Sequence, residues 1–265
     1  MSPKWGGAMK KKQIIITVVI VILLLAGAAW FMVPRVKLYN AAKELTENSF
    51  PATSHCEYFN QFDVTYASNQ AVQTISYDGL SIDIPADWTI LENSLENSLT
   101  YESPDKSQRI LLSEASDLTG YSLFNEEQVA ELTADLSSKV GLKRLEKGFD
   151  DLGIPMPDSA YATMKSTLLL ERDSYSLFNA DKTIAYYIVS MIKSNEPEFG
   201  LNYIYETEDI CATYHVSPPS DEHPYRTVAD VFSAKDLNKA YSMVIRTNSE
   251  ETLYAMMNSV QVTNE

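Results

Sequence analysis

The two cysteines and three histidines are the side chains best suited to bind a metal ion or to form a cross-link. His55 adjoins Cys56. Cys211 and His215 lie four residues apart on one face of a predicted strand, and His223 follows in a loop. If the cysteines met in space, the histidines would come with them and a Cys/His site could form. The spacings do not match known zinc modules, and an oxidising exterior favours a disulfide. We therefore predict no metal site, and the sequence leaves open whether Cys56 and Cys211 are bonded.

Patterns for nucleophilic catalysis and phosphate binding are incomplete in this chain. Ser190 to Lys193 matches Ser-x-x-Lys, in which lysine can activate serine, but it ends a predicted helix and lacks the companion motifs. Gly148 and Gly153 have the spacing of a phosphate loop, but Ile154-Pro155 occupy the positions of its Lys and Ser/Thr. The carboxylates are too numerous for a glycosidase pair to be selected. We predict no catalytic residue and no cofactor.

One uncharged apolar segment, Ile14 to Val33, is long enough to cross a membrane. Its twenty residues span about 30 Å as a helix, which is the thickness of the hydrocarbon core. Lys4 and Lys10 to Lys12 precede it, against Arg35 and Lys37 after it. The larger positive cluster favours the cytoplasm. The sequence therefore predicts a cytoplasmic basic tail over residues 1–13, a bilayer anchor over residues 14–33, and a C-terminal part outside the cell.

A cleaved signal peptide is the competing interpretation of the same segment. Leu25-Ala26-Gly27-Ala28 offers small residues to a peptidase, and it resembles a lipoprotein box with alanine in place of the lipidated cysteine. The apolar run continues from Trp30 to Val33, beyond the candidate cleavage point, and signal peptides usually have shorter apolar cores. We favour the uncleaved anchor. Both interpretations export the remainder of the chain.

Charge separates the N-terminal segment from the rest. Residues 1–37 hold six of the 21 Lys and Arg and none of the 36 Asp and Glu. The acidic remainder repels phosphate backbones, so nucleic acid is an unfavourable ligand. Residues 34–73 are polar and turn-rich after a weak helical continuation, which predicts a spacer that lifts the domain off the bilayer and partly packs against it. Residues 74–265 are long enough to form a sizeable core.

The periodicity of residues 74–265 predicts strands, then helices, then strands. Alternating residues predict strands at 80–84, 99–102 and 109–113, and later at 201–205, 210–216, 228–232, 241–245 and 260–262. Between them, a helix capped by Asn125 and ended by Gly141 is followed by a loop with Gly148 and Gly153. Further helices are predicted from Asp158, over 181–193 and after Ser249. This order indicates an α+β domain with a mostly antiparallel sheet flanked by helices, preceded by one transmembrane helix.

The pentapeptide Tyr-Ser-Leu-Phe-Asn occurs twice, at Tyr121 to Asn125 and at Tyr175 to Asn179. Each copy precedes a predicted helix. In that position the asparagine can cap the helix, and the Leu and Phe side chains can pack against it. The flanking residues do not align, so the repeat predicts a shared local structure and no duplicated domain.

The segment Tyr77 to Trp88 resembles the opening hairpin of PsbP-like domains, in which a strand ends in proline and tryptophan follows. The C-terminal segment, Ala240 to Val262, is similar to the family's last strand, helix and closing strand. The resemblance implies an α/β/α sandwich that is generally non-catalytic, with residues of about 120–198 as a helical insertion. Pro85 and Trp88 would then have structural roles, because an aromatic ring after a strand end covers the sheet edge.

These observations lead to one functional hypothesis and two alternatives. The sequence predicts a membrane-anchored binding or assembly module of a bacterial cell surface, with the lipid bilayer and a surface protein as partners. The alternatives are an anchored extracellular hydrolase acting on envelope material and an accessory or sensory domain of a membrane complex. Buried carboxylates in a polar cluster would favour the enzyme.

Overall fold

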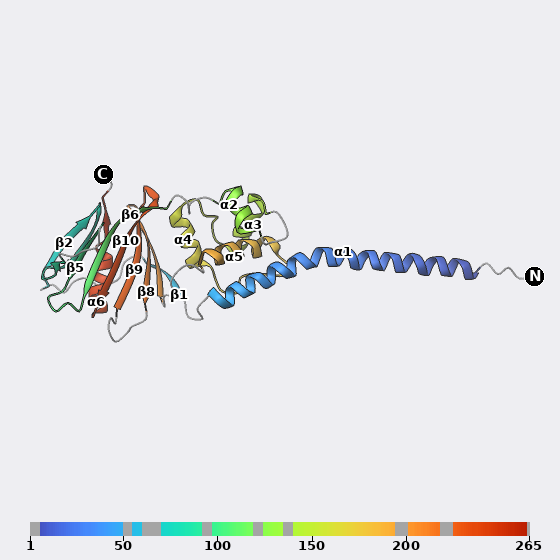
Figure 1. The fold of residues 1–265 in the computed structure, drawn as a ribbon, viewed down its shortest axis with the longest axis horizontal. Coiled ribbons are helices and arrows are strands. Elements are labelled where there is room, and N and C mark those ends of the chain that lie inside the picture. The colour runs from blue at the N-terminus through green and yellow to red at the C-terminus, as the bar shows by residue number, and fades with distance from the viewer. Residues whose placement is uncertain are drawn as a thin grey trace, which may run out of the picture.

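An extended helix, a helical layer and a sheet layer follow one another along the long axis of the molecule (Figure 1). The computed structural model describes residues 6–49, 55–59, 70–91, 97–118, 124–134, 140–193, 201–217 and 225–263. The fold is α+β with a mostly antiparallel sheet flanked by helices, which confirms the predicted fold class.

Helix α1 (Gly6–Ser49) is a long rod. Its N-terminal part projects away from the folded part, and its C-terminal end lies against the helical layer (Figure 1). Among the described residues it is the helix long and apolar enough to cross a membrane. Its large apolar side chains from Ile16 to Val36 are exposed. Leu38, Ala42 and Thr46, at four-residue spacing on one face, are instead buried against the helical layer. One helix therefore joins the apolar segment to the fold.

In the region predicted as a spacer, residues 34–73, the described residues are mainly helix and strand, and residues 50–54 and 60–69 lie outside the described part. Residues 34–49 continue α1, β1 (His55–Phe59) enters the large sheet, and β2 (Val72–Tyr77) begins in this region. Sequence patterns missed β1 because its pairing partner is β7, almost 150 positions later in the chain. Such non-local pairing leaves no periodic signal in a five-residue segment.

Four helices form the helical layer: α2 (Glu126–Leu132), α3 (Leu142–Leu152), α4 (Ala160–Leu169) and α5 (Ala180–Lys193). Asn125 caps α2 as predicted, and its Oδ1 accepts from the Gln128 amide at 2.9 Å. The predicted loop around Gly148 is wrong, because these residues form α3. Gly141 precedes α3 as its N-cap, whereas it was predicted to end the helix before it. Part of that predicted helix, residues 135–139, lies outside the described residues.

Gly148 lies inside α3 because α3 crosses α5 at very close range. A Cβ atom at this position would overlap the Asp181 carbonyl oxygen. Gly153 ends α3 with a positive φ of 75°, the left-handed conformation that favours glycine. Two glycines that indicated a loop in sequence are thus required by a helix crossing and by a helix end.

The large sheet has eight strands in the order β1-β7-β8-β9-β10-β6-β5-β4. All its described neighbours are antiparallel except β1 and β7, which are parallel. The strands other than β1 are β4 (Thr89–Ile90), β5 (Ser98–Glu102), β6 (Arg109–Asp117), β7 (Leu201–Glu206), β8 (Ile210–Ser217), β9 (Tyr225–Ser233) and β10 (Asp236–Thr247). The structure has strands at all the predicted positions of this sheet.

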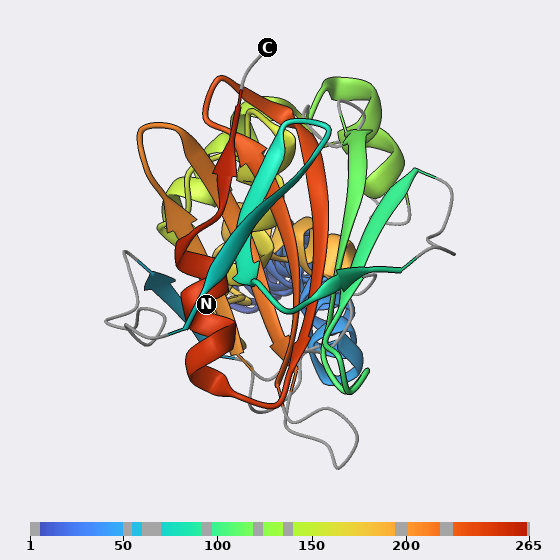
Figure 2. The same ribbon diagram turned by 90° about the vertical axis from the view of Figure 1, so that its left-hand side faces the viewer.

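A three-stranded sheet, β11-β3-β2, covers one face of the large sheet together with α6 (Figure 2). Here β3 spans Leu80–Pro85, α6 spans Glu250–Asn258 and β11 spans Gln261–Val262. Asp78 and Gly79, with φ of 49° and 87°, turn β2 into β3. A hairpin is therefore present at the predicted opening segment, and its first strand begins two residues before the predicted start of the domain at residue 74.

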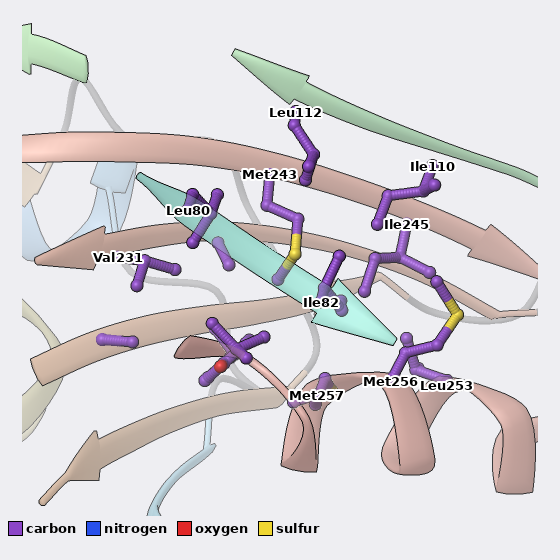
Figure 3. Close-up of a cluster of buried hydrophobic side chains, with 14 of the residues drawn as sticks. Leu80, Ile82, Ile110, Leu112, Val231, Met243, Ile245, Leu253, Met256 and Met257 are labelled. Atoms are coloured by element: carbon purple, nitrogen blue, oxygen red, sulfur yellow. The ribbon is translucent and has the colours of Figure 1, made fainter. Parts of the chain in front are cut away.

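The main hydrophobic core lies between the two sheets and α6. Leu80 and Ile82 of β3 point toward β10 and β6, and the α6 methionines close the cluster from the other side (Figure 3). Trp88 belongs to this core and is 3% exposed. Pro85 ends β3, and its carbonyl oxygen accepts from the Trp88 amide at 3.1 Å. Both residues thus occupy structural positions at the end of the hairpin.

Candidate functional site

The opposite face of the large sheet, which we call the helical face, meets the helical layer and carries its polar side chains. Strand alternation sends Ala229 and Val231 into the main core, and Phe232 into a separate cluster with Tyr161 of α4. The same alternation on β7, β8 and β9 directs a set of polar residues to the helical face, namely Asn202, Glu206, Cys211, Thr213, His215 and Asp230. We take this face as the candidate site.

A hydrogen-bonded triad of Tyr161, Lys165 and Glu206 lies where α4 crosses the end of β7. The Tyr161 hydroxyl donates to Glu206 Oε1 at 3.0 Å, and Lys165 Nζ donates to the same oxygen at 2.7 Å. Lys165 Nζ also lies 5.3 Å from the ring centroid of Tyr58 on β1. The lysine and glutamate side chains are 22% and 38% exposed. The triad can therefore be reached from solvent.

Capping contacts hold α4 in place above this triad. The Ser159 hydroxyl accepts from the Ala162 amide at 3.2 Å, one position after the predicted start at Asp158. The Ala160 amide donates to Asn238 Oδ1 at 2.9 Å, which ties the helix start to the β9–β10 hairpin. These bonds set the direction in which Tyr161 and Lys165 project toward the sheet.

Two members of the triad, Tyr161 and Lys165, hold their protons at neutral pH. Burial, together with the Glu206 charge and hydrogen bond, raises the pKa of Tyr161 far above its usual value. Burial alone would lower the pKa of Lys165, but the hydrogen bond and charge of Glu206 outweigh it and raise that pKa. Tyr161 is thus a neutral hydroxyl donor and Lys165 a cation. This arrangement suits the recognition of hydrogen-bond acceptors or anions more than proton abstraction.

Cys56 and Cys211 are both free thiols in the structure. Cys56 pairs with Asn202 of β7, and Cys211 pairs with Glu206 of the same strand. Their positions are thus about 13 Å apart along the strands and about 10 Å across them. A disulfide needs Cα atoms within about 7 Å. Backbone pairing of β1 with β7, rather than a disulfide, joins the segment after α1 to the sheet.

Burial also suppresses the reactivity of both thiols. It raises the pKa of Cys56 to about 11, although the nearby Lys193 charge acts in the opposite direction. It raises the pKa of Cys211 as well, and the Glu206 charge adds to the shift. A thiol must lose its proton to act as a nucleophile or a metal ligand. Neither cysteine is therefore poised for such chemistry at neutral pH.

His215 is a neutral histidine held by an amide. Its Nδ1 lies 2.8 Å from Asn202 Oδ1 across the β7–β8 pair. Burial, aided by the Lys193 charge, lowers its pKa to about 4. The described residues contain no group of three or more His, Cys, Asp or Glu side chains that could hold a metal ion. The side chains of His55 and His223 lie outside the described part of the chain.

Asp230 and Thr213 form a polar pair at the centre of the helical face. They are direct partners across β8 and β9. Burial alone raises the pKa of Asp230 to about 6. Thr213 is fully buried, and its Oγ1 has no hydrogen-bond partner within the described ranges. Within the described residues, the sheet thus presents a carboxyl group whose pKa is raised by burial alone, beside a hydroxyl group that has no hydrogen-bond partner.

The residues that sequence patterns singled out have other roles. Ser190 is fully buried in α5, and Lys193 Nζ donates to the Thr167 carbonyl oxygen at 2.9 Å. Sequence reasoning missed the triad because its members lie about 40 residues apart and become neighbours only when α4 crosses β7. In the sequence, Glu206 was one of many carboxylates among which no functional pair could be selected. The alternation of β9 could have indicated Asp230, since it interrupts an otherwise largely apolar strand.

Comparisons with known proteins leave the identity of the fold family open. No family model matches the chain, and no curated protein matches it. A solved structure from Bacteroides thetaiotaomicron VPI-5482 is similar over 71% of this chain and 46% of that chain, with 12% sequence identity and a TM-score of 0.31. This chain spans less than half of that protein, and a likeness at this level identifies neither a fold family nor a function.

Proposed function

We propose that the protein is a membrane-anchored binding module whose folded part is held rigidly outside the cell. The observation that carries this proposal is the continuity of α1, which runs without interruption from the exposed apolar segment into the helical layer. The Thr46 hydroxyl lies 2.7 Å from the Tyr186 hydroxyl of α5, and the rings of Tyr39 and Tyr175 are 5.0 Å apart. A helix fixed in this way positions the domain relative to the bilayer.

The helical face supports binding over catalysis in this proposal. Its tyrosine, lysine and thiols hold their protons, and its histidine is neutral. The triad opens to solvent beside Tyr58, a 58% exposed aromatic on the edge strand β1. Aromatic rings next to a cation are frequent anchors of protein interfaces. The PsbP-like resemblance of residues 77–88 and 240–262 agrees with a non-catalytic module.

Cysteine accessibility in intact cells tests the anchor and its orientation. In a Cys56→Ser/Cys211→Ala background, Asp150→Cys reports on the domain and Ser2→Cys on the N-terminal tail. A membrane-impermeant maleimide should label the first variant in intact cells and the second only after lysis. The reverse pattern would place the domain in the cytoplasm. A mature N-terminus at Ala29 or Trp30, measured by mass spectrometry, would show cleavage and overturn the anchor.

Site-specific photo-cross-linking tests the binding role. A benzoyl-phenylalanine replacing Tyr58 should give a discrete adduct with one surface polypeptide in intact membranes, and Lys165→Glu should weaken it at least threefold. The same photo-reactive residue replacing Tyr254 on α6 is the control, because α6 lies on the other side of the large sheet (Figure 1). Equal labelling at both positions would contradict binding through the triad.

Asp230 is the observation that favours the alternative, an anchored hydrolase. A pKa of about 6 would let this carboxyl exchange a proton near neutral pH. A glycosidase, however, needs two carboxyl groups about 5 to 10 Å apart. Burial alone sets the Asp230 pKa, without a contribution from a second acid. Release of sugar or peptide from cell-envelope material by the protein, abolished by Asp230→Asn, would establish the hydrolase instead of the binding module.

A further inference from the structure

The second Tyr-Ser-Leu-Phe-Asn segment places an aromatic ring in solvent where the first copy buries one. Both asparagines cap a helix: Asn125 Oδ1 accepts from Gln128, and Asn179 Oδ1 accepts from the Lys182 amide at 3.0 Å. Phe124 is 9% exposed and its ring lies 5.7 Å from that of Phe149, whereas Phe178 is 82% exposed. The prediction that the phenylalanine of each copy packs against its helix is therefore wrong for Phe178.

The exposed ring lies at the end of the helical layer nearest the apolar part of α1. Helix α5 runs beside α1 in the same direction, because Tyr175 contacts Tyr39 and Tyr186 contacts Thr46 further along both segments. Lys193, at the other end of α5, lies near Cys56 and His215 of the sheet. The N-terminal end of α5, with Phe178 just before it, therefore faces away from the sheet.

Helix geometry gives the level of Phe178 relative to the membrane. Thr46 lies 13 residues after Val33, which is about 20 Å along α1. Phe178 precedes Tyr186 by eight positions, which is about 12 Å back toward the apolar segment. Phe178 is thus about 8 Å beyond the level of Val33. The headgroup zone of one leaflet is about 5 to 8 Å thick, so the ring is level with it.

The charges around Phe178 suit a lipid surface. Lys182 lies one turn later on α5, where its amine can extend toward headgroups. The acidic neighbours are ion-paired: Asp181 lies 2.8 Å from Arg144 and 3.1 Å from Lys147, and Asp173 lies 3.7 Å from Arg172. The negative charge of the domain is therefore compensated locally by basic side chains at the end that would approach the bilayer.

We propose that Phe178 inserts into the outer leaflet of the bilayer that α1 crosses and forms a second membrane contact. This inference rests on the proposed anchoring. Insertion removes the apolar surface of the exposed aromatic ring from water, and the nearby lysine and arginine side chains remain with the headgroups. Two contacts, one through α1 and one through Phe178, fix the tilt of the folded part above the membrane.

Tryptophan quenching by brominated lipids in vesicles tests the contact with the full chain. The parent carries Trp5→Phe and Trp30→Phe, so that the buried Trp88 alone remains. Phe178→Trp is compared with Ile90→Trp, a control on β4 in the sheet layer where the native side chain is 53% exposed. We expect phosphatidylcholine vesicles brominated at the acyl chains to quench the tryptophan introduced at position 178 at least twice as strongly as the one at position 90.

Flotation of the same vesicles separates this inference from the anchor. Protein that floats with vesicles, but shows equal quenching at positions 178 and 90, would retain the anchor and overturn the Phe178 contact. Protein that does not float would overturn the anchoring and the contact with it. In detergent, the Trp88 emission of a Phe178→Ser variant is compared with that of the parent. Identical spectra establish that substitution at position 178 preserves the fold.

Discussion

At the scale of single side chains, burial is the largest influence on the pKa values of the thiols, His215 and Asp230 on the helical face. It keeps the thiols protonated, His215 neutral and the Asp230 carboxyl hard to ionise. The triad differs, because Glu206 accepts hydrogen bonds from both Tyr161 and Lys165. The helical face therefore combines a hydrogen-bonded triad, which solvent reaches at Lys165 and Glu206, with ionisable groups whose charged forms are disfavoured by burial.

Asp230→Asn should stabilise the protein at pH 8 by about 2 to 3 kcal/mol. The folded-state pKa of about 6 lies above the ordinary value of 3.8, so the folded state binds more protons than the unfolded state between these values. The native protein therefore loses stability as pH rises from about 4 to about 6, and the asparagine variant does not. Urea unfolding at pH 4 and pH 8 measures the difference.

Asp87→Asn, at an exposed position, is the matched control for the Asp230 experiment. It should change the unfolding free energy by less than about 0.5 kcal/mol at either pH. A destabilised Asp230→Asn variant at pH 8 would show that the carboxylate has a partner that stabilises its charge, such as a bound cation.

At the scale of elements, close helix crossing decides the helical layer. Helices α3 and α5 approach so closely that Gly148 has no room for a side chain, and the Arg144–Asp181 ion pair closes the same crossing. The partly exposed ion pair adds little to stability. The close backbone contact is therefore the feature that a substitution would disturb most.

Gly148→Ala should destabilise the fold by about 1 to 3 kcal/mol. The new methyl group would meet the Asp181 backbone and the Ala185 side chain, so α3 and α5 must move apart. Glu146→Ala, on the exposed side of the same helix, should change stability by less than about 0.5 kcal/mol. Urea unfolding of both variants in detergent measures the effect, and equal midpoints would show that the crossing relaxes without cost.

At the scale of the whole molecule, α1 belongs to both the apolar rod and the folded part. Its last turns bury Leu38, Ala42 and Thr46 against a cluster that includes Tyr186 and Ile184. Removing these turns would expose that cluster and leave the buried Tyr186 hydroxyl without Thr46. The exposed apolar part of α1 therefore passes into the packed part within one helix, near Pro34.

Two truncations test this boundary. A chain of residues 34–265 should be soluble and unfold cooperatively, because it keeps Leu38, Ala42 and Thr46, the buried side chains by which α1 contacts the helical layer. A chain of residues 50–265 should lose about 3 kcal/mol or more and bind a hydrophobic dye, because it loses the buried Leu38 side chain and its neighbours. Thermal unfolding and dye fluorescence compare the two, and equal stability would mean that α1 only lies beside the fold.

Local sequence patterns predicted the elements that depend on neighbouring residues. The apolar run of α1, the Asp78-Gly79 turn, the Asn125 cap and the alternating strands β7 to β10 each carry their signal within a few positions. The Ser103–Lys106 turn is equally local, because the Lys106 amide donates to the Ser103 carbonyl oxygen at 2.9 Å. Together these elements were sufficient to predict the α+β class.

Only the tertiary structure decided where distant segments meet. The parallel pairing of β1 with β7, the crossing that places Gly148 inside a helix, and the separation of Cys56 from Cys211 depend on contacts between remote parts of the chain. The same is true of the Tyr161–Lys165–Glu206 triad, and of the different environments of Phe124 and Phe178 in two identical pentapeptides. The sequence by itself determined the apolar segment and the α+β class, because both arise from local composition and periodicity. The site required the packing of α4 and α5 against the sheet.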